Sequence, residues 1–208
     1  MELNKINEVL DYLISNFKID ISQPSPITIP GMSRYTLADV FAELGFMKGV
    51  EIGVQAGKYS KILCRANPIM EFYGIDPYEE YPDIGIPGEQ EGQDRGYEIA
   101  KANIPSNCTL IRKKSMDAVG DFPDGYFDFV YIDGNHIFSY VANDIFEWSK
   151  KIRKGGILAG HDYRRYYPRS FIHVYQVVNA YTEAYAIKPW FLTDNSTENV
   201  RSFFWIVK

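Results

Sequence analysis

The chain has 208 residues, a formal charge of −5 and a pI near 5.3, which suits one α/β domain with a sizeable core. The acidic balance, without a long basic run, argues against nucleic acid as the partner. No apolar run reaches membrane-spanning length and the first residues lack the layout of a leader peptide, so we expect a cytoplasmic protein without membrane contact. Cys64 and Cys108 fit no metal or redox motif, and two reduced, buried thiols are expected.

The N-terminal part predicts a helical extension, residues 1–46, in front of a core domain of residues 47–208. Apolar residues recur there at helical spacing: Leu3, Ile6, Leu10, Leu13 and Phe17. We expect this stripe to pack on the core domain, with a homo-oligomer contact through the helix as the alternative. A connector rich in Pro and Ser, residues 22–30, leads to a second helix at residues 34–44.

The chain is organised around an apolar strand, residues 48–53, that breaks into a glycine turn and opens a helix at residues 57–66. The first N–H groups of such a helix lack partners within it, and Gly53 and Gly57 let a ligand approach the backbone. The spacing G-x-x-x-G differs from the G-x-G-x-x-G of dinucleotide binders, and Glu51 lies two residues before the first glycine. The turn therefore favours a cationic or zwitterionic ligand over a pyrophosphate, with glycines that serve chain geometry alone as the alternative.

Strands and helices alternate after this turn, which predicts an α/β fold with a mostly parallel sheet and helices on both faces. Further strands are expected at residues 71–75, 109–113, 127–132 and 157–160, with a hairpin at 190–193 and 202–207. The helix after the fourth strand has one apolar face and closes at two glycines: Ile137, Val141, Ile145, Trp148 and Ile152, then Gly155 and Gly156. The long loop of residues 77–96 is predicted to be a mobile lid.

Polar side chains end the predicted parallel strands, at the edge of the sheet where open α/β folds bind ligands. The first strand ends in Glu51 and the glycines, and the others in Asp76, Ser115, Asp133 and the pair His161-Asp162. A single carboxylate at a strand end is often a helix cap. Five polar strand ends in succession instead predict a ligand site.

Four motifs together resemble the class I S-adenosylmethionine-dependent methyltransferases, over about residues 48–208. They are E-x-G-x-x-x-G-x-x-S, G-I-D-P, F-D-F-V-Y-I-D-G-N-H and K-G-G-I-L-A-G-H-D-Y. The last two are more specific and are similar to the small-molecule O-methyltransferase branch that includes macrolide sugar O-methyltransferases. The resemblance implies a Rossmann-like sheet of seven strands, mostly parallel with an antiparallel last strand.

The resemblance also implies a set of cofactor contacts for S-adenosylmethionine: Glu51, Gly53, Gly57, Ser60, Asp76, Ser115, Met116 and Asp133. Glu51 and the two glycines would lie at the methionine part. Asp76 would accept both ribose hydroxyls, since one carboxylate offers two oxygens to a vicinal diol. Ser115, or Met116 beside it, would flank the adenine, and Asp133 would face the reacting centre.

The chemistry implied by the resemblance is methyl transfer to a hydroxyl of a small molecule or sugar. Such a hydroxyl is a poor nucleophile, which a divalent ion such as Mg²⁺ activates while a base takes its proton. Asp133, Asp162 and His161 are the expected metal ligands and His136 the expected base, with Asp133 also catalytic. The alternative for His136 is a helix cap or a hydrogen bond to a neighbour.

An aromatic and basic loop follows the fifth strand, with Tyr163, Tyr166 and Tyr167 beside Arg164, Arg165 and Arg169. We expect it to stack on a sugar ring or to grip an anionic group, with loop packing as the alternative. His173 has no partner in view and is expected to be structural. Two other functions remain open: a nicotinamide-dependent oxidoreductase and a non-catalytic S-adenosylmethionine-binding protein.

Overall fold

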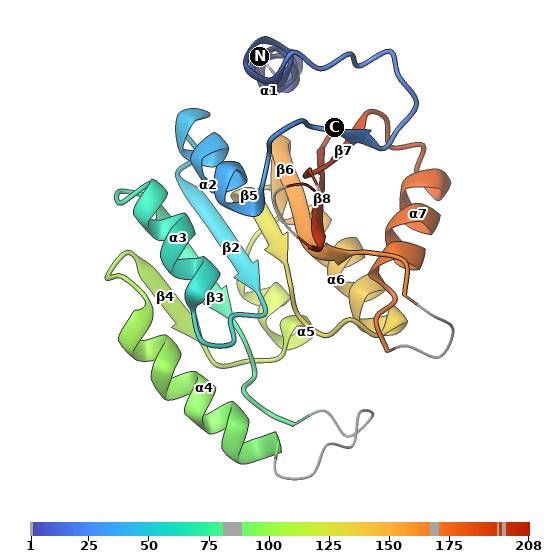
Figure 1. Cartoon of the computed structure of the whole chain (residues 1–208). Coiled ribbons are helices and arrows are strands. Elements are labelled where there is room, and N and C mark those ends of the chain that lie inside the picture. The colour runs from blue at the N-terminus through green and yellow to red at the C-terminus, as the bar shows by residue number, and fades with distance from the viewer. Residues whose placement is uncertain (1, 81–88, 167–170, 195, 197–198) are drawn as a thin grey trace.

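The computed structural model describes residues 2–80, 89–166, 171–194, 196 and 199–208 (Figure 1). The described helices are α1 (Glu2–Phe17), α2 (Arg34–Glu43), α3 (Lys58–Ala66), α4 (Glu89–Asn103), α5 (Ser115–Ala118), α6 (Phe138–Lys150) and α7 (Val174–Ala184), with a 3-10 turn η1 (Val119–Asp121). The described strands are β1 (Ile27–Thr28), β2 (Lys48–Ile52), β3 (Glu71–Ile75), β4 (Cys108–Ile111), β5 (Phe127–Ile132), β6 (Ile152–Tyr163), β7 (Trp190–Leu192) and β8 (Arg201–Ile206).

The strands form one sheet in the order β1-β7-β8-β6-β5-β2-β3-β4. Only β8 runs antiparallel to its neighbours β6 and β7 among these described strands, which confirms the mostly parallel sheet with an antiparallel last strand. The predicted number of seven strands is wrong by one, because two residues of the predicted connector form β1 and pair with β7. A two-residue strand between prolines is too short to show a periodicity in the sequence.

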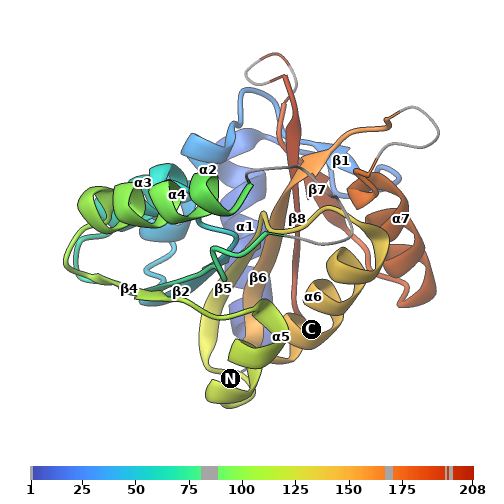
Figure 2. The ribbon, with the colours of Figure 1, turned by 90° about the horizontal axis from the view of Figure 1, so that it is seen from below.

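Helices cover both faces of the sheet, as predicted (Figure 2). Successive side chains of a strand point to opposite faces. Phe129 and Tyr131 of β5 therefore lie in one hydrophobic cluster with residues of α1, α2 and α3. Val130 and Ile132 lie in a second cluster with α6 and α7.

The apolar face of α1 is buried within its own chain, since Leu13 has an exposed fraction of 0% and Val9 of 3%. Both belong to the cluster that contains α2 and the sheet. This packing on the core was the expected one, and contact between two copies through the helix stays a prediction. None of the helices in the described part of the chain has the length and apolar character needed to cross a membrane.

The segment after β5 differs from the prediction. Helix α6 ends at Lys150, and Ile152 begins β6 instead of closing the helix. Gly155 has a φ of 76° inside this strand, and the pairing with β5 is irregular there. The two glycines thus mark a strand irregularity and not a helix end, two uses of glycine that a sequence does not distinguish.

The loop predicted for residues 77–96 does not extend that far, because α4 already begins at Glu89; its role as a lid stays a prediction. Residues before the gap are anchored: Tyr78 is fully buried, and the guanidinium of Arg112 donates to the carbonyls of Pro77 and Tyr78. The remaining part of the predicted lid, residues 81–88, lies outside the described residues. Cys64 and Cys108 are free thiols; Cys64 is buried, as expected, whereas Cys108 is only partly buried.

Candidate active site

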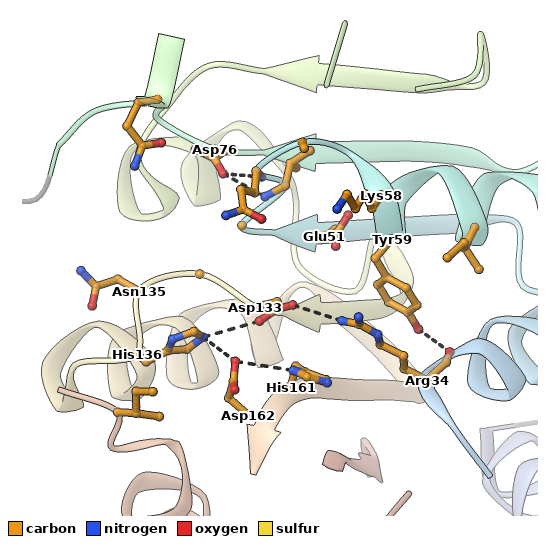
Figure 3. A pocket seen from close by; sticks show the side chains of 18 of the residues that line it. Arg34, Glu51, Lys58, Tyr59, Asp76, Asp133, Asn135, His136, His161 and Asp162 are labelled. Atoms are coloured by element: carbon orange, nitrogen blue, oxygen red, sulfur yellow. Dashed lines mark hydrogen bonds and ion pairs between the residues drawn. The ribbon is translucent and has the colours of Figure 1, made fainter. Parts of the chain in front are cut away.

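A cavity of about 590 Å³ lies beyond the carboxyl ends of β2, β5 and β6 (Figure 3). After β2 the chain builds β3 and β4 on one side of that strand and then returns to place β5 on the other side. The cavity is therefore at the reversal of strand order, where open α/β sheets bind ligands. The N–H of Asp133 donates to the carbonyl of Ile52 at 2.7 Å and fixes the ends of β2 and β5 to each other.

The glycine turn forms one wall of this cavity. Gly53 has a φ of 91°, and a Cβ there would overlap the carbonyl oxygen of Asp133. Gly57, with a φ of 70°, is the residue before α3, but it is not among the cavity-lining residues. A Cβ on Gly57 would press against Ala100 and Ile104, so tight packing against α4 explains this glycine.

Glu51 lines the cavity from β2 with only 2% of its surface exposed. Burial raises its pKa well above the usual range, although a hydrogen bond from the Ser60 hydroxyl opposes this shift. Ser60 is fully buried and does not line the cavity. It therefore positions Glu51 and has no access to a ligand in this arrangement.

Asp76 lines the cavity, but backbone amides occupy its carboxylate. One oxygen accepts the N–H groups of Val54 and Gln55 at 2.9 Å each, and the other accepts the N–H of Tyr78 at 2.8 Å. These bonds hold the glycine turn against the end of β3. The predicted contact with two ribose hydroxyls would have to share an acceptor that is already used three times.

Among the residues that the structure describes, Asp133, His136 and Asp162 form a group able to hold a metal ion. One ligand atom from each lies within 4.8 Å of the others. His136 Nε2 lies 3.0 Å from Asp162 Oδ2 and 3.5 Å from Asp133 Oδ1, as dashed lines in Figure 3 show. His161 is beside this group, with Nδ1 3.5 Å from Asp162 Oδ2. The structure thus brings His136, the predicted base, to the place expected for His161.

An irregularity at the end of β6 turns Asp162 toward the cavity. The pairing with β8 is regular up to Gly160 and resumes at Tyr163, which leaves His161 and Asp162 unpaired in between. Asp162 has a φ of 58°, in the left-handed region that Asp tolerates better than most residues. Such bulges redirect side chains, and here both residues line the cavity.

The charges of this cluster stabilise one another. Burial disfavours a charged imidazole, but the two carboxylates outweigh it and raise the pKa of His136 to about 9. Burial also opposes ionisation of Asp162, yet contacts with His136 and His161 hold its pKa below the usual range. The two carboxylates therefore favour the protonated form of the His136 ring.

Helix α2, which the prediction placed outside the core domain, contributes two side chains to the cavity. Arg34 Nη1 lies 4.0 Å from Asp133 Oδ2, and the carbonyl of Arg34 accepts the hydroxyl of Tyr59 at 2.8 Å. Tyr35 also lines the cavity and is 48% exposed. No sequence motif points to these residues, because the resemblance begins only after α2.

A second cavity of about 200 Å³ adjoins the first, since Gly53, Gly134 and Asn135 line both. Ser115 and Met116, the predicted neighbours of the adenine, line this second cavity. The Nδ2 atom of Asn135 is buried and has no hydrogen-bond partner among the described residues. A polar ligand that extends through both cavities could satisfy this donor.

The aromatic loop does not meet the expectation for Tyr163. Its ring is 3% exposed and packs on Tyr175 and Trp190, so it belongs to the core. The guanidinium of Arg164 lies over the Tyr166 ring at 5.5 Å, while Tyr167 and Arg169 are outside the described residues. The exposed aromatic residues at the first cavity are instead Tyr35 and Phe171, the latter 57% exposed.

His173 is structural, as expected. Its Nδ1 accepts the N–H of Phe138 at 3.1 Å, and its own N–H donates to the carbonyl of His136 at 2.8 Å. These two bonds connect the start of α7 to the start of α6. They thereby hold the segment that carries His136.

The fold and the site define an α/β protein with a cavity at the carboxyl edge of the sheet, between a glycine turn and an Asp-His-Asp cluster. The family described as "Methyltransferase domain" matches residues 50–163, more than half of the chain, and the chain belongs to this family. An uncharacterized protein of Acanthamoeba polyphaga mimivirus is 31% identical over 123 residues. That match covers 56% of this chain and 52% of the relative, so the chain spans about half the length of the curated relative it matches.

Solved structures share the fold at low sequence identity. The O-methyltransferase of Bacillus cereus, in complex with S-adenosylhomocysteine, is 16% identical with a TM-score of 0.57, covering 98% of this chain and 90% of that one. The O-methyltransferase TomG of Streptomyces achromogenes, in complex with S-adenosylmethionine, is 15% identical with a TM-score of 0.52, covering 98% and 90%. At these identities the similarity concerns the fold.

Proposed function

We propose that this protein transfers the methyl group of S-adenosylmethionine to a hydroxyl of a small molecule, with a divalent ion such as Mg²⁺ bound at Asp133, His136 and Asp162. The observation that carries the proposal is the convergence of these three ligand atoms at the floor of the cavity, beside the glycine turn. Membership in the methyltransferase family supports it and leaves the nicotinamide-dependent oxidoreductase without support. A sugar hydroxyl is the acceptor that the sequence resemblance favours.

The two joined cavities fit the cofactor in their chemistry. The larger one offers a carboxyl group, Glu51, for an ammonium and two cations, Arg34 and Lys58, for a carboxylate. The buried Nδ2 of Asn135 offers an unused donor where the cavities meet. When bound, the sulfonium would supply the methyl group: the acceptor oxygen would bond to the methyl carbon as its bond to sulfur breaks, with the neutral thioether as the leaving group. The protein's part is to hold acceptor and cofactor in line.

The Asp-His-Asp cluster fits a divalent ion. The Nε2 atom of His136 is buried, lies between two carboxylates and has no partner at hydrogen-bond geometry among the described residues. Carboxylate ligands suit Mg²⁺ and Mn²⁺, whereas an imidazole ligand shifts the preference of the site toward transition metals. The ion would supply a lowered pKa of the bound hydroxyl and a fixed direction for its attack.

The proton of the acceptor needs a group other than His136 if that imidazole binds the ion. His161 lines the same cavity, and its contact with Asp162 at 3.5 Å restrains the ring. We therefore assign the role of proton acceptor to His161. This exchanges the roles that the sequence suggested for the two histidines.

Calorimetric titration with S-adenosylhomocysteine, together with a radiolabelled methyl-transfer assay against a panel of hydroxylated acceptors, tests the proposal. We expect the product analogue to bind with and without a chelator, and transfer to occur only with the ion, because the ion serves the acceptor. Absence of binding would contradict the methyltransferase function. Transfer that survives chelation would contradict the metal site alone.

A further inference from the structure

The two thiols of the chain meet between a helix and the edge of the sheet, and neither lines a cavity. Cys64 lies on α3 and is 1% exposed, and Cys108 begins β4, the last strand in the order of the sheet. Cys108 is the Cα partner of Phe72, and paired residues point to the same face of a sheet. Phe72 belongs to the hydrophobic cluster that contains Cys64, and Cys108 packs against this cluster. Both thiols are therefore on one face of the sheet, where a side-chain hydrogen bond joins them.

This hydrogen bond gives the two sulfurs different chemistry. The Cys64 thiol donates to the Cys108 sulfur, which with the N–H of Gly74 holds the pKa of Cys108 below its usual range, although burial opposes the shift. The same bond and burial raise the pKa of Cys64. Cys108 is only partly buried, whereas Cys64 is buried. Because the thiolate is the nucleophilic form of cysteine, an oxidant reacts first at Cys108.

Cys64 is positioned to react with the first product of that oxidation. A sulfenic acid condenses with a neighbouring thiol to form a disulfide. The thiol beside Cys108 is that of Cys64, and these two are the only cysteines of the sequence. The pair thus contains an accessible nucleophile and a protected thiol that resolves its oxidised form.

We propose that Cys64 and Cys108 form a reversible oxidation site for a hydroperoxide such as hydrogen peroxide. The Cys108 thiolate attacks one peroxide oxygen, the O–O bond breaks and hydroxide leaves, which gives the sulfenic acid of Cys108. The Cys64 sulfur then bonds to the Cys108 sulfur, whose bond to oxygen breaks, and the hydroxyl group leaves as water with the Cys64 proton. The two thiols lose two electrons and the peroxide gains them. The hydroxide takes up the proton that Cys108 had released, so two water molecules form.

A disulfide would change one wall of the first cavity through α3. Ser60 lies one turn before Cys64 on this helix, and its hydroxyl donates to Glu51, which lines the cavity. An S–S bond of about 2.05 Å is shorter than a contact between unbonded sulfurs, so its formation draws this part of α3 toward β4. The bond from Ser60 to Glu51 is then disturbed. Weaker cofactor binding by the oxidised protein follows, and this step alone rests on the proposed function.

Mass spectrometry of the whole protein treated with hydrogen peroxide tests the site. Wild-type protein should lose about 2 Da, the two thiol hydrogens, and yield a peptide pair that joins Cys64 to Cys108. Dithiothreitol should restore the original mass. Separate sulfinic or sulfonic acids on the two cysteines would overturn the proposal. So would two unchanged thiols at a peroxide concentration that oxidises free cysteine.

Two variants separate the roles of the sulfurs. Cys64→Ala removes the resolving thiol, so the sulfenic acid of Cys108 should be trapped by dimedone. Cys108→Ala leaves only the buried thiol of Cys64, which should stay reduced under the same treatment. Equal reaction of the two variants would overturn the assigned roles. The wild-type measurement tests the disulfide if either variant fails to fold.

Calorimetry with S-adenosylhomocysteine measures the effect on the cavity. The disulfide form should bind about 2–10-fold more weakly than the reduced form, the usual contribution of one hydrogen bond. Cys64→Ala cannot form the disulfide and is the matched control, whose affinity should survive the same treatment. Equal affinity of the two wild-type forms would overturn the effect through Ser60 and Glu51. Absence of binding to the reduced protein would contradict the methyltransferase function instead, and the mass measurement would still decide the oxidation site.

Discussion

Asp76 and Asp162 are aspartates at the carboxyl ends of two parallel strands, yet their carboxylates meet different partners. Asp76 follows β3 and accepts three backbone N–H groups of the glycine turn and the next loop. Asp162 is the penultimate residue of β6 and contacts two imidazoles, those of His136 and His161, at 3.0 and 3.5 Å. Carboxylates bound by amides hold the chain, whereas carboxylates bound by imidazoles can exchange these partners for a metal ion. The same residue type at one edge of the sheet therefore holds the backbone at Asp76 and belongs to the proposed metal site at Asp162.

The largest effect on methyl transfer is expected for Asp162, the aspartate that belongs to the proposed metal site. Asp162→Ala should slow methyl transfer by about 10²–10⁴-fold, because loss of the ion removes several kcal/mol of stabilisation from the transition state. The affinity for S-adenosylhomocysteine should stay the same, as measured by calorimetry. Asp124→Ala, which removes a mostly exposed carboxylate before β5, is the matched control and should retain the rate. A normal rate in Asp162→Ala would show that both aspartates are structural.

A third carboxyl, Asp144, sharpens the comparison because its partner is a neutral hydroxyl. Its pKa of about 7 lies above the value of 3.8 for the free side chain. Between these values the folded protein keeps a proton that the unfolded chain has lost, so the free energy of unfolding should fall as pH rises from about 4 to about 7. At about 1.36 kcal/mol per pH unit the total is about 4 kcal/mol.

Denaturant unfolding of wild-type protein and of Asp144→Asn at pH 4.5 and pH 8 measures this contribution. The variant cannot ionise at this position, and it should therefore lose less stability than the wild type over the range. Parallel pH dependences of the two proteins would contradict a raised pKa for Asp144.

A smaller effect is expected for Asp76, the aspartate whose carboxylate holds the glycine turn. Asp76→Asn replaces one acceptor oxygen by a donor group, so amide exchange of Val54, Gln55 and Tyr78 should accelerate in hydrogen-exchange measurements. Val54 and Gln55 line the cavity, and their N–H groups donate to the Asp76 carboxylate. Because a hydrogen bond to a charged group contributes about 1.5–3 kcal/mol, its loss should loosen this wall and weaken binding of S-adenosylhomocysteine by about 10–100-fold. Weakened binding with unchanged exchange would show instead that Asp76 contacts the ribose directly.

Much of the fold was predictable, because the arrangement of the sheet follows from the sequence pattern of alternating strands and helices. The buried strand, the glycine turn and the alternation that follows predicted the parallel sheet, in which β5 and β6 pair. From this the approach of Asp133 to Asp162 follows. The strand β1 and the irregularity at Gly155 were missed, because two residues show no period and a glycine does not reveal which conformation it serves.

The site was less predictable than the fold because several of its side chains are set by packing between distant segments. Arg34 reaches the cavity because α2 packs on α3, where the hydroxyl of Tyr59 donates to the carbonyl of Arg34. In the sequence Asp144 is one polar residue of an amphipathic helix, and only the structure shows that the hydroxyl of Ser115 donates to it. The orientation of His161 and Asp162 at the cavity depends on the irregularity at the end of β6, which has no signal in the sequence.

The most direct test of the Asp-His-Asp site is a crystal structure of the protein with S-adenosylhomocysteine and Mn²⁺, with anomalous scattering used to locate the metal. We predict one anomalous peak in the first cavity, within about 2.0–2.3 Å of oxygens of Asp133 and Asp162 and of His136 Nε2, with His161 outside the coordination sphere. A cavity that holds the cofactor product but no metal, or a peak on His161 in place of His136, would contradict this assignment.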